Sequence, residues 1–314
     1  MRVLGISPLD KDSTVTLMED GKIVFAAGEE RFTRVKLQDG FPWQALQAAF
    51  DATGADASSI DCVAYPFFTW EKETELFRRN LAAEREFIDE SESVSSGLIK
   101  DALARVPART ETIPGLANPN ERMEKGFAKT MAYRILASES VISRNVAKRG
   151  SEQWGREAAA FHRKWHEELE TGLDELGLGG KLKRVDHHAS HAANAYYGSG
   201  FADALIVTLD GYGSGLAGSI SVGRGGAISR LHGVEYPHSL GTFYESVTSA
   251  LGFKPSRHEG KIVGLAAYGD PKILRDVLLA RFDIEDGGFR IRESNNLYFA
   301  RMLDRKSTRL NSSH

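Results

Sequence analysis

The chain has 314 residues, 41% of them hydrophobic and 26% charged, and its formal net charge at pH 7 is −3. This length exceeds what one hydrophobic core normally supports, so we expect two lobes. The slightly acidic balance argues against a dedicated nucleic-acid binder, which usually presents a basic face. No apolar run reaches about 18 residues and no secretion signal opens the chain, which predicts a soluble protein of the cytoplasm.

Residues 1–66 predict the first part of an α/β lobe. Asp20-Gly21 between two apolar runs is a strong hairpin signal. Cys62 is the only cysteine, so no internal disulfide can form, and its apolar surroundings predict a buried thiol rather than a nucleophile. Apolar runs bounded by turn residues indicate three strands, a helix and a fourth strand, an order typical of an RNase-H-like lobe: Arg2–Ile6, Ser13–Met18, Lys22–Ala27, Trp43–Thr53 and Asp61–Tyr65.

Residues 67–181 predict a helical insertion of three or four helices packed on one edge of the core. The segment is rich in Ala, Glu and Arg, and its apolar residues recur at helical spacing. Its charged residues indicate a solvated face, with substrate or dimer contacts as the alternative. Three prolines interrupt the pattern near its middle: Pro107, Pro114 and Pro119.

Residues 182–200 return to the first lobe, with a strand at Leu182–Val185 and a helix that ends near Gly200. Residues 201–304 predict part of a second lobe, in which the apolar run Ala204–Leu209 reads as a buried strand. Two more strands follow, at Leu216–Val222 and Ile228–Glu235. This order repeats that of the opening residues. The predicted fold class is therefore α/β, an actin-like ATPase fold of duplicated RNase-H-like lobes with a helical insertion, in which nucleotide lies between the lobes.

Two histidines and one aspartate form the most informative pattern. His187 and His191 are four residues apart, so a helix places both imidazoles on one face with Cβ atoms roughly 5–6 Å apart. Asp210 ends an apolar strand, and ligands of open α/β sheets gather at such strand ends. Two imidazoles and a carboxylate suit Fe, Zn or Mn. We predict a metal site, with a histidine pair that merely decorates the surface or core as the alternative.

Two further stretches carry weaker signals. In GEERFTRVK the charges indicate a solvated edge, although Arg31, Arg34 and Lys36 also suit an anionic substrate such as a phosphate. In SRHEGKIVGLAAYGD, glycines near a helix start expose backbone N–H groups to a phosphate and Lys261 adds charge, but an ordinary glycine-rich helix junction explains them equally well. The apolar residues of this second stretch are expected to pack inward: Ile262, Val263 and Leu265.

Several motifs, taken in order, resemble the carbamoyltransferase family, which includes nodulation-factor and antibiotic O-carbamoyltransferases. They are LGIS…KDSTVTLMEDG…EERFTRVK, VDHHASHAANAYY, TLDGYGSG, SLGTFYESVTSALGF and EGKIVGLAAYGDP. The resemblance runs from Arg2 to about Pro271 and is loosest across the insertion. The amino-terminal part of the family is similar to the tRNA threonylcarbamoyladenosine synthase subunit of the actin-like superfamily, and a YrdC-like domain follows it.

This resemblance implies a two-step reaction. The YrdC-like domain makes carbamoyl-adenylate from carbamoyl phosphate and ATP, and the actin-like domain passes the carbamoyl group to a hydroxyl of a small molecule with the help of a metal, often iron. His187, His191 and Asp210 become the metal ligands. The candidates for catalysis are His188, which would transfer the hydroxyl proton, Lys36 and Lys11. The residues implied to hold the nucleotide are Asp12, Ser13, Gly211, Gly213, Gly241, Glu259, Gly260, Lys261 and Gly264.

The chain departs from the family pattern in two ways. Lys11 stands where many relatives have a histidine, so the role of that histidine cannot be carried over. A fourth metal ligand, an aspartate late in the actin-like domain, has no counterpart. Residues 305–314 are polar and unpatterned, and we expect them to be an artefactual tail on a truncated gene. A second lobe cut short would expose a strand edge and apolar surface, which favours aggregation.

Two other functions stay open at this point. A tRNA threonylcarbamoyl transferase-like enzyme fits the same fold, but the acidic balance favours small-molecule chemistry. A fragment that binds metal and nucleotide without catalysis is the other alternative. The expected partners are a small-molecule hydroxyl acceptor, carbamoyl phosphate and ATP, with no membrane. The sequence leaves the acceptor, the metal and the oligomeric state undetermined.

Overall fold

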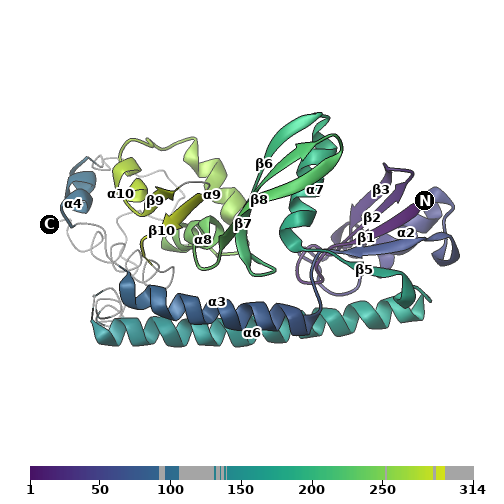
Figure 1. The fold of residues 1–314 in the computed structure, drawn as a ribbon, viewed down its shortest axis with the longest axis horizontal. Helices are drawn as coiled ribbons and strands as arrows, with labels where there is room; N and C mark the ends of the chain where they lie inside the picture. Colours follow the sequence, from purple (N-terminus) through teal and green to yellow (C-terminus); the bar gives the residue numbers. More distant parts are fainter. Residues whose placement is uncertain are drawn as a thin grey trace, which may run out of the picture.

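The structure is a computed structural model that describes residues 1–91, 96–105, 140–251, 253–285 and 288–293, together with residues 131, 135 and 138. Figure 1 shows two β-sheets and a carboxy-terminal group of short helices and strands arranged in a row. A pair of long helices, α3 (Trp70–Glu90) and α6 (Val141–Glu175), runs along one side of this row. The architecture is mixed α/β, as the sequence predicts.

The first sheet has five strands in the order β3-β2-β1-β4-β5. β1 lies antiparallel to β2 and parallel to β4, which in turn lies parallel to β5. All five match the predicted strands to within one residue at each end. In chain order they are Arg2–Ile6, Thr14–Glu19, Lys22–Gly28, Cys62–Tyr65 and Leu182–Arg184.

Helices cover one face of the first sheet and complete its core. Leu4 and Leu17 are fully buried there, and α2 (Trp43–Thr53) packs on them through Leu46. Leu169 of α6 belongs to the same cluster, so the insertion also contributes to this core. Cys62 is only partly buried, contrary to prediction, because side chains alternate along a strand and its neighbour Val63 is the one that faces the core.

The turn and the helix in this lobe have clear local causes. Asp20 and Gly21 have φ angles of 47° and 80°, the left-handed conformations that a type I′ hairpin requires. At the start of α2, the buried Glu29 carboxylate accepts hydrogen bonds from the backbone N–H groups of Gln44 (3.1 Å) and Ala45 (2.7 Å). These hydrogen bonds give partners to two of the backbone N–H groups that have none within the first turn of the helix. The expectation of solvated edge charges is therefore wrong for Glu29.

The helical insertion does not stay on one edge of the core. Its described residues contain α3, α4 (Ser96–Ala104) and α6. α3 and α6 lie side by side, and α6 extends from the first sheet past the second (Figure 1). Asn80 of α3 donates a hydrogen bond to the Gly215 carbonyl at 2.6 Å, so the insertion is also tied to the second sheet. The prolines predicted to interrupt the insertion lie outside the described residues: Pro107, Pro114 and Pro119.

The second sheet has three antiparallel strands in the order β6-β7-β8. They span Asp203–Gly213, Leu216–Arg224 and Ala227–Glu235. α7 (His187–Ser199) covers one face, where Tyr196 packs against Ile206. This helix ends at Gly200 in the left-handed conformation, as the glycine predicts.

β6 is buried on one face only. Leu205, Val207 and Leu209 lie on the face opposite α7 and are 68%, 53% and 54% exposed. The prediction of a buried strand is therefore wrong for these alternate residues. Within the described part of the chain β6 pairs with β7 alone.

The remaining described elements are short. In α9 only Ile262 is buried, while Val263 is 63% and Leu265 47% exposed, so the expected inward packing is wrong for two of the three residues. No described helix combines the length and the apolar character that a membrane crossing requires. Residues 305–314 lie outside the described residues. The short elements are α1 (Glu30–Thr33), α8 (Leu240–Ala250), α9 (Glu259–Ala266), α10 (Arg275–Leu279), β9 (Phe282–Glu285), β10 (Gly288–Ile291) and two 3₁₀ turns (Ala57–Ser59 and Gly179–Lys181).

Candidate metal centre

α7 starts where it can present two histidines toward the second sheet. The Asp186 side chain caps the helix by accepting a hydrogen bond from the backbone N–H of Ala189 at 2.7 Å. Asp186 also pairs with Arg230 of β8, which ties the helix start to the sheet. Since His187 opens the helix, His191 lies one turn further on the same face.

The two histidines and Asp210 converge on one point. His187 Nε2 lies 2.7 Å from Asp210 Oδ2 and 3.0 Å from His191 Nε2, and the third side of the triangle measures 3.4 Å. A metal ion at about 2.1 Å from each ligand separates neighbouring ligand atoms by roughly 3.0 Å in an octahedral site and 3.4 Å in a tetrahedral site. The spacing of these atoms therefore fits a metal ion, and among the described residues they form the group able to bind one.

The hydrogen bond of the His187 ring leaves its Nε2 lone pair available to bind a cation. Its Nδ1 lies 3.2 Å from the Pro66 carbonyl oxygen, which can only accept, so Nδ1 carries the proton. The Nε2 lone pair of the neutral ring then faces the Asp210 carboxylate. Two such electron-rich atoms repel each other unless a proton or a metal ion lies between them. A carbonyl partner on the far ring nitrogen is the usual arrangement behind a histidine ligand.

The His187 ring is held in place by its neighbours. Phe67 stacks on it with ring centres 4.5 Å apart and planes 22° from parallel. On another side Gly213 packs so closely that a Cβ atom there would overlap with the ring. The sequence predicts that Gly213 contacts nucleotide. In the structure a glycine is required at this position because the His187 ring occupies the space that a side chain would need.

Asp210 is oriented through its backbone. Its Oδ1 accepts a hydrogen bond from the Gly211 N–H, and its carbonyl oxygen accepts one from the Ser239 hydroxyl at 2.8 Å. Gly241 in the first turn of α8 touches this peptide, since a Cβ atom there would come within 2.6 Å of the Asp210 carbonyl carbon. Burial alone would raise the pKa of the Asp210 carboxyl, but the adjacent His187 and His191 rings outweigh burial and hold this pKa well below its usual range.

His188 does not lie where its predicted role requires. The His188 ring is fully buried between α7 and the second sheet, with Nδ1 2.9 Å from the Thr208 hydroxyl and Nε2 3.2 Å from the Leu216 carbonyl oxygen. Burial also lowers the pKa of this histidine. Both ring nitrogens are occupied and no substrate can reach them, so the expectation that His188 transfers the hydroxyl proton is corrected: it is a core histidine.

Lys11 does approach the second lobe. Its ammonium donates a hydrogen bond to the Ser256 carbonyl oxygen at 2.8 Å, and the Ser256 side chain in turn bonds to Glu245. Burial raises the pKa of Glu245, and the nearby Glu259 and Asp210 charges raise it further while Lys11 lowers it. Ser256 also donates its backbone N–H to the Glu259 carboxylate at 2.8 Å, so hydrogen bonds to Ser256 bring Lys11, Glu245 and Glu259 together. Glu245 was not singled out by the sequence, because it lies in a helix with an ordinary core pattern.

The other residues predicted to bind nucleotide or to take part in catalysis differ in how exposed they are. Asp12 is exposed in a turn with φ of 61°, and Gly260, Lys261 and Gly264 are exposed on α9. Ser13 is fully buried, and its hydroxyl donates to the Gly40 carbonyl at 2.7 Å, so it cannot contact a phosphate as expected. Lys36 is exposed on the segment after α1 and makes no hydrogen bond or ion pair with the described residues.

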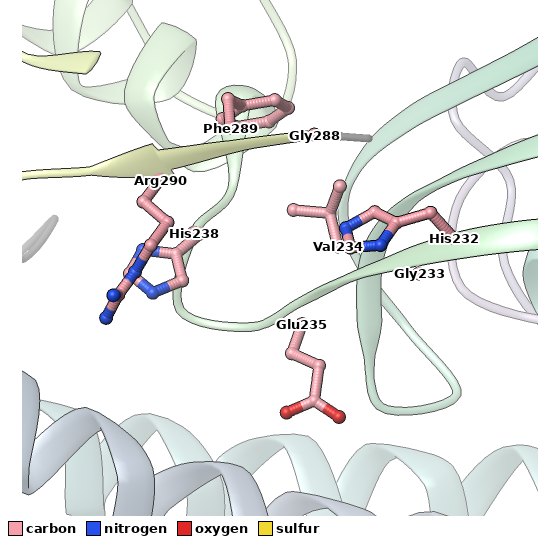
Figure 2. A pocket seen from close by; sticks show the side chains of 8 residues that line it. All are labelled: His232, Gly233, Val234, Glu235, His238, Gly288, Phe289 and Arg290. Carbon is pink, nitrogen blue, oxygen red and sulfur yellow. The ribbon is translucent and has the colours of Figure 1, made fainter. Parts of the chain in front are cut away.

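A separate hollow lies between β8 and β10 (Figure 2). This cavity of about 170 Å³ is lined by charged and imidazole side chains that include Glu235, His238 and Arg290. Burial, and to a smaller extent the Arg290 charge, lowers the pKa of His238 to about 4. None of the predicted site residues lines it, and it is smaller than the roughly 300 Å³ at which ligand pockets begin. It is therefore distinct from the metal centre.

The comparison with protein families decides the affiliation of the chain. Residues 116–310 match the family described as carbamoyltransferase N-terminus. The chain belongs to this family. The matched segment contains the three candidate ligands His187, His191 and Asp210, so the metal centre lies in the part of the chain that characterises the family.

Individual relatives of the chain are much longer than the part that it matches. It is similar to an uncharacterized protein of Synechocystis sp. (28% identical over 95% of this chain and 39% of that protein). It is also similar to the nodulation protein NolNO of Sinorhizobium fredii (27% identical, 89% of this chain, 31% of that protein). A shorter match is to the nodulation protein NolO of Bradyrhizobium diazoefficiens (37% identical, 34% of this chain, 20% of that protein). The chain thus spans less than half the length of these relatives.

Proposed function

We propose that the chain is the transfer module of a metal-assisted O-carbamoyltransferase. It takes the carbamoyl group from carbamoyl-adenylate, which the YrdC-like domain of resembling enzymes makes from carbamoyl phosphate and ATP, and passes it to a hydroxyl of a small molecule. The observation that carries this proposal is the convergence of His187, His191 and Asp210 in a member of the carbamoyltransferase N-terminal family.

The chain's own residues bind and orient the reactants. His187 and His191 offer nitrogen lone pairs and Asp210 a carboxylate oxygen, and three protein ligands leave positions open for substrate. A bound divalent metal, Fe with Zn or Mn as alternatives, supplies polarisation of the carbamoyl carbonyl. The acceptor oxygen forms a bond with the carbamoyl carbon, the bond from that carbon to the AMP phosphate breaks, and the hydroxyl proton passes to a base. Because AMP leaves readily, orientation of the two reactants is the main requirement.

We further propose that the fold is actin-like and that nucleotide lies between its lobes. The meander β6-β7-β8 followed by α8 repeats the meander β1-β2-β3 followed by α2, which supports a duplication. Lys11 of the first lobe reaches Ser256 near the start of α9. In this arrangement Lys11, Asp12 and the first turn of α9, with Glu259, Gly260 and Lys261, surround the phosphates, and Gly211 connects them to the metal centre.

Metal binding is the first test of the proposed centre. We expect the purified chain to bind Fe²⁺, Zn²⁺ or Mn²⁺, and His187→Ala or Asp210→Ala to weaken binding more than tenfold while the far-ultraviolet circular dichroism stays unchanged. His232→Ala, in an exposed histidine of β8, is the matched control and should leave binding intact. Unchanged metal occupancy in both ligand variants would refute the site.

Supplied carbamoyl-adenylate separates the proposal from its alternatives. Transfer to an added hydroxyl compound supports the enzyme, whereas binding without turnover supports a non-catalytic fragment. Salt-sensitive binding of tRNA would instead favour a tRNA threonylcarbamoyl transferase-like enzyme. Lys261→Ala should weaken nucleotide binding with metal retained, and an unaltered nucleotide affinity would remove Lys261 from that site.

A further inference from the structure

A carboxylate of the helical insertion is buried next to the metal centre. Glu73, in the first turn of α3, is fully buried. Its Oε1 accepts a hydrogen bond from the Ser214 hydroxyl at 2.7 Å and another from the Phe68 backbone N–H at 3.1 Å. Its Oε2 has no hydrogen-bond partner among the described residues. Burying a carboxylate with an unpaired oxygen costs free energy, so a gain in stability does not explain why Glu73 lies at this position.

Both hydrogen bonds of Glu73 lead to the segments that hold His187. The Ser214 hydroxyl accepts a bond from the His187 backbone N–H at 3.3 Å. Phe68 follows Pro66, whose carbonyl fixes the Nδ1 proton of His187, and Phe67, which stacks on its ring. Glu73 therefore joins the loop after β4 and the β6–β7 turn at the two places where they contact one metal ligand.

We propose that Glu73 is a positioning residue of the metal centre, acting through Ser214 and the Pro66–Phe68 segment to orient the His187 imidazole. This inference rests on the proposed metal site. Glu73 touches neither the metal position nor a substrate, so its effect passes through the direction of the His187 Nε2 lone pair. Residues that support a ligand in this way typically change metal affinity by 10–100-fold when they are removed.

Cobalt binding provides the test, since Co²⁺ replaces Fe²⁺ or Zn²⁺ and its visible spectrum reports ligand geometry. We expect Glu73→Ala to weaken Co²⁺ binding about 10–100-fold in titration calorimetry and to shift the visible absorption bands. Glu73→Gln should restore both, because its amide oxygen can accept the hydrogen bonds of Ser214 and Phe68. A purely structural role would change the melting temperature without changing the spectrum.

Glu84 is the matched control on the same helix. It is also fully buried, and its Oε2 likewise has no hydrogen-bond partner among the described residues, but it bonds to Tyr236 rather than to Ser214. Glu84→Ala should leave Co²⁺ affinity and spectrum unchanged, because Glu84 is not linked to the segments that hold His187. Equal losses of affinity in Glu73→Ala and Glu84→Ala would show that any buried carboxylate of α3 has this effect, and would overturn the inference.

The outcomes distinguish this inference from the metal site itself. If the unaltered chain binds no Co²⁺, the metal centre fails and the role of Glu73 with it. If the unaltered chain binds Co²⁺, His187→Ala does not, and Glu73→Ala binds normally, only the positioning role is overturned. Should Glu73→Ala not fold, Ser214→Ala removes the same link from the other side, and unchanged binding by that variant refutes the proposal.

Discussion

β1 of the first sheet lies between an antiparallel neighbour, β2, and a parallel one, β4, whereas β6 of the second sheet pairs only with β7 in the described residues. The two strands start equivalent meanders, yet Leu4 of β1 is fully buried and Leu205 of β6 is 68% exposed. The difference shows that an apolar strand sequence does not determine burial. Burial depends on which elements cover each face, and α7 covers only one face of the second sheet.

The candidate metal centre lies where these two regions meet. His187 follows β5, the last strand of the first sheet, and Asp210 comes from β6 of the second. The loop after β4 contacts His187 directly through Pro66, and the insertion helix α3 is linked to His187 through Glu73 and Ser214. The five-stranded first sheet thus supports one candidate ligand, and the three-stranded second sheet provides another.

The largest expected difference between the two sheets is in core energetics. Leu4→Ala should lower the free energy of unfolding by about 2–5 kcal/mol, since it leaves a cavity in a closed core. Leu205→Ala removes a side chain that is largely in contact with water, so it should change the free energy of unfolding by less than about 0.5 kcal/mol. Urea unfolding measures both. Similar losses would mean that the exposed face of β6 is covered in solution.

A buried histidine of α6, His162, should make stability depend on pH. Burial, with a smaller effect of His187, lowers the pKa of His162 to about 4, against about 6.5 in the unfolded chain. Below pH 6.5 the unfolded chain binds a proton that the folded chain excludes, so stability falls as pH decreases from about 6.5 to 4. At pH 5 the loss relative to pH 7 is about 2 kcal/mol.

Urea midpoints at pH 7 and pH 5 test this contribution. His162→Phe, which keeps a ring beside Phe67 and Phe77, should reduce the difference between the two midpoints. His232→Phe is the control, because that residue is exposed, and it should leave the difference unchanged. An undiminished pH dependence in His162→Phe would exclude His162 as its source.

The helix caps of the two regions should differ in strength. Glu29 caps α2 from a distant loop with two backbone hydrogen bonds, whereas Asp186 caps α7 from the adjacent position with one. We expect Glu29→Ala to lower the free energy of unfolding by about 1–3 kcal/mol and Asp186→Ala to lower it by about 1 kcal/mol, measured by urea unfolding. Glu29→Gln, which keeps one acceptor, should lie between Glu29→Ala and the unaltered chain. A larger loss for Asp186→Ala would reverse this order.

A substitution on the exposed face of β6 should have the smallest effect on stability but a measurable effect on solubility. Val207→Lys should change the free energy of unfolding by less than about 0.5 kcal/mol. It should also reduce self-association, because it places a charge in an exposed apolar patch beside a strand edge that no other described strand pairs with. Light scattering over a range of concentrations measures this. Ile23→Lys, at an exposed position of β3, the edge strand of the first sheet, is the control; it lies outside the apolar patch of β6 and should have less effect.

Local patterns in the sequence determined much of this protein. The hairpin at Asp20-Gly21, the helix Trp43–Thr53 and the pairing of His187 with His191 follow from turn conformations and from the period of a helix, which involve residues close in sequence. The approach of Asp210 to the histidines was also predictable, because it rests on the general position of ligands at strand ends.

Only the tertiary structure decided the remaining features. The burial of His188 and Ser13, the exposure of Leu205, and the link from Glu73 through Ser214 to His187 all depend on which distant segments pack together. Glu73 is 141 residues from Ser214 in the chain, so no periodicity or spacing connects them. Hydrogen bonds and burial at such separations are set by the path of the whole backbone, and a sequence read locally contains the residue types but not their partners.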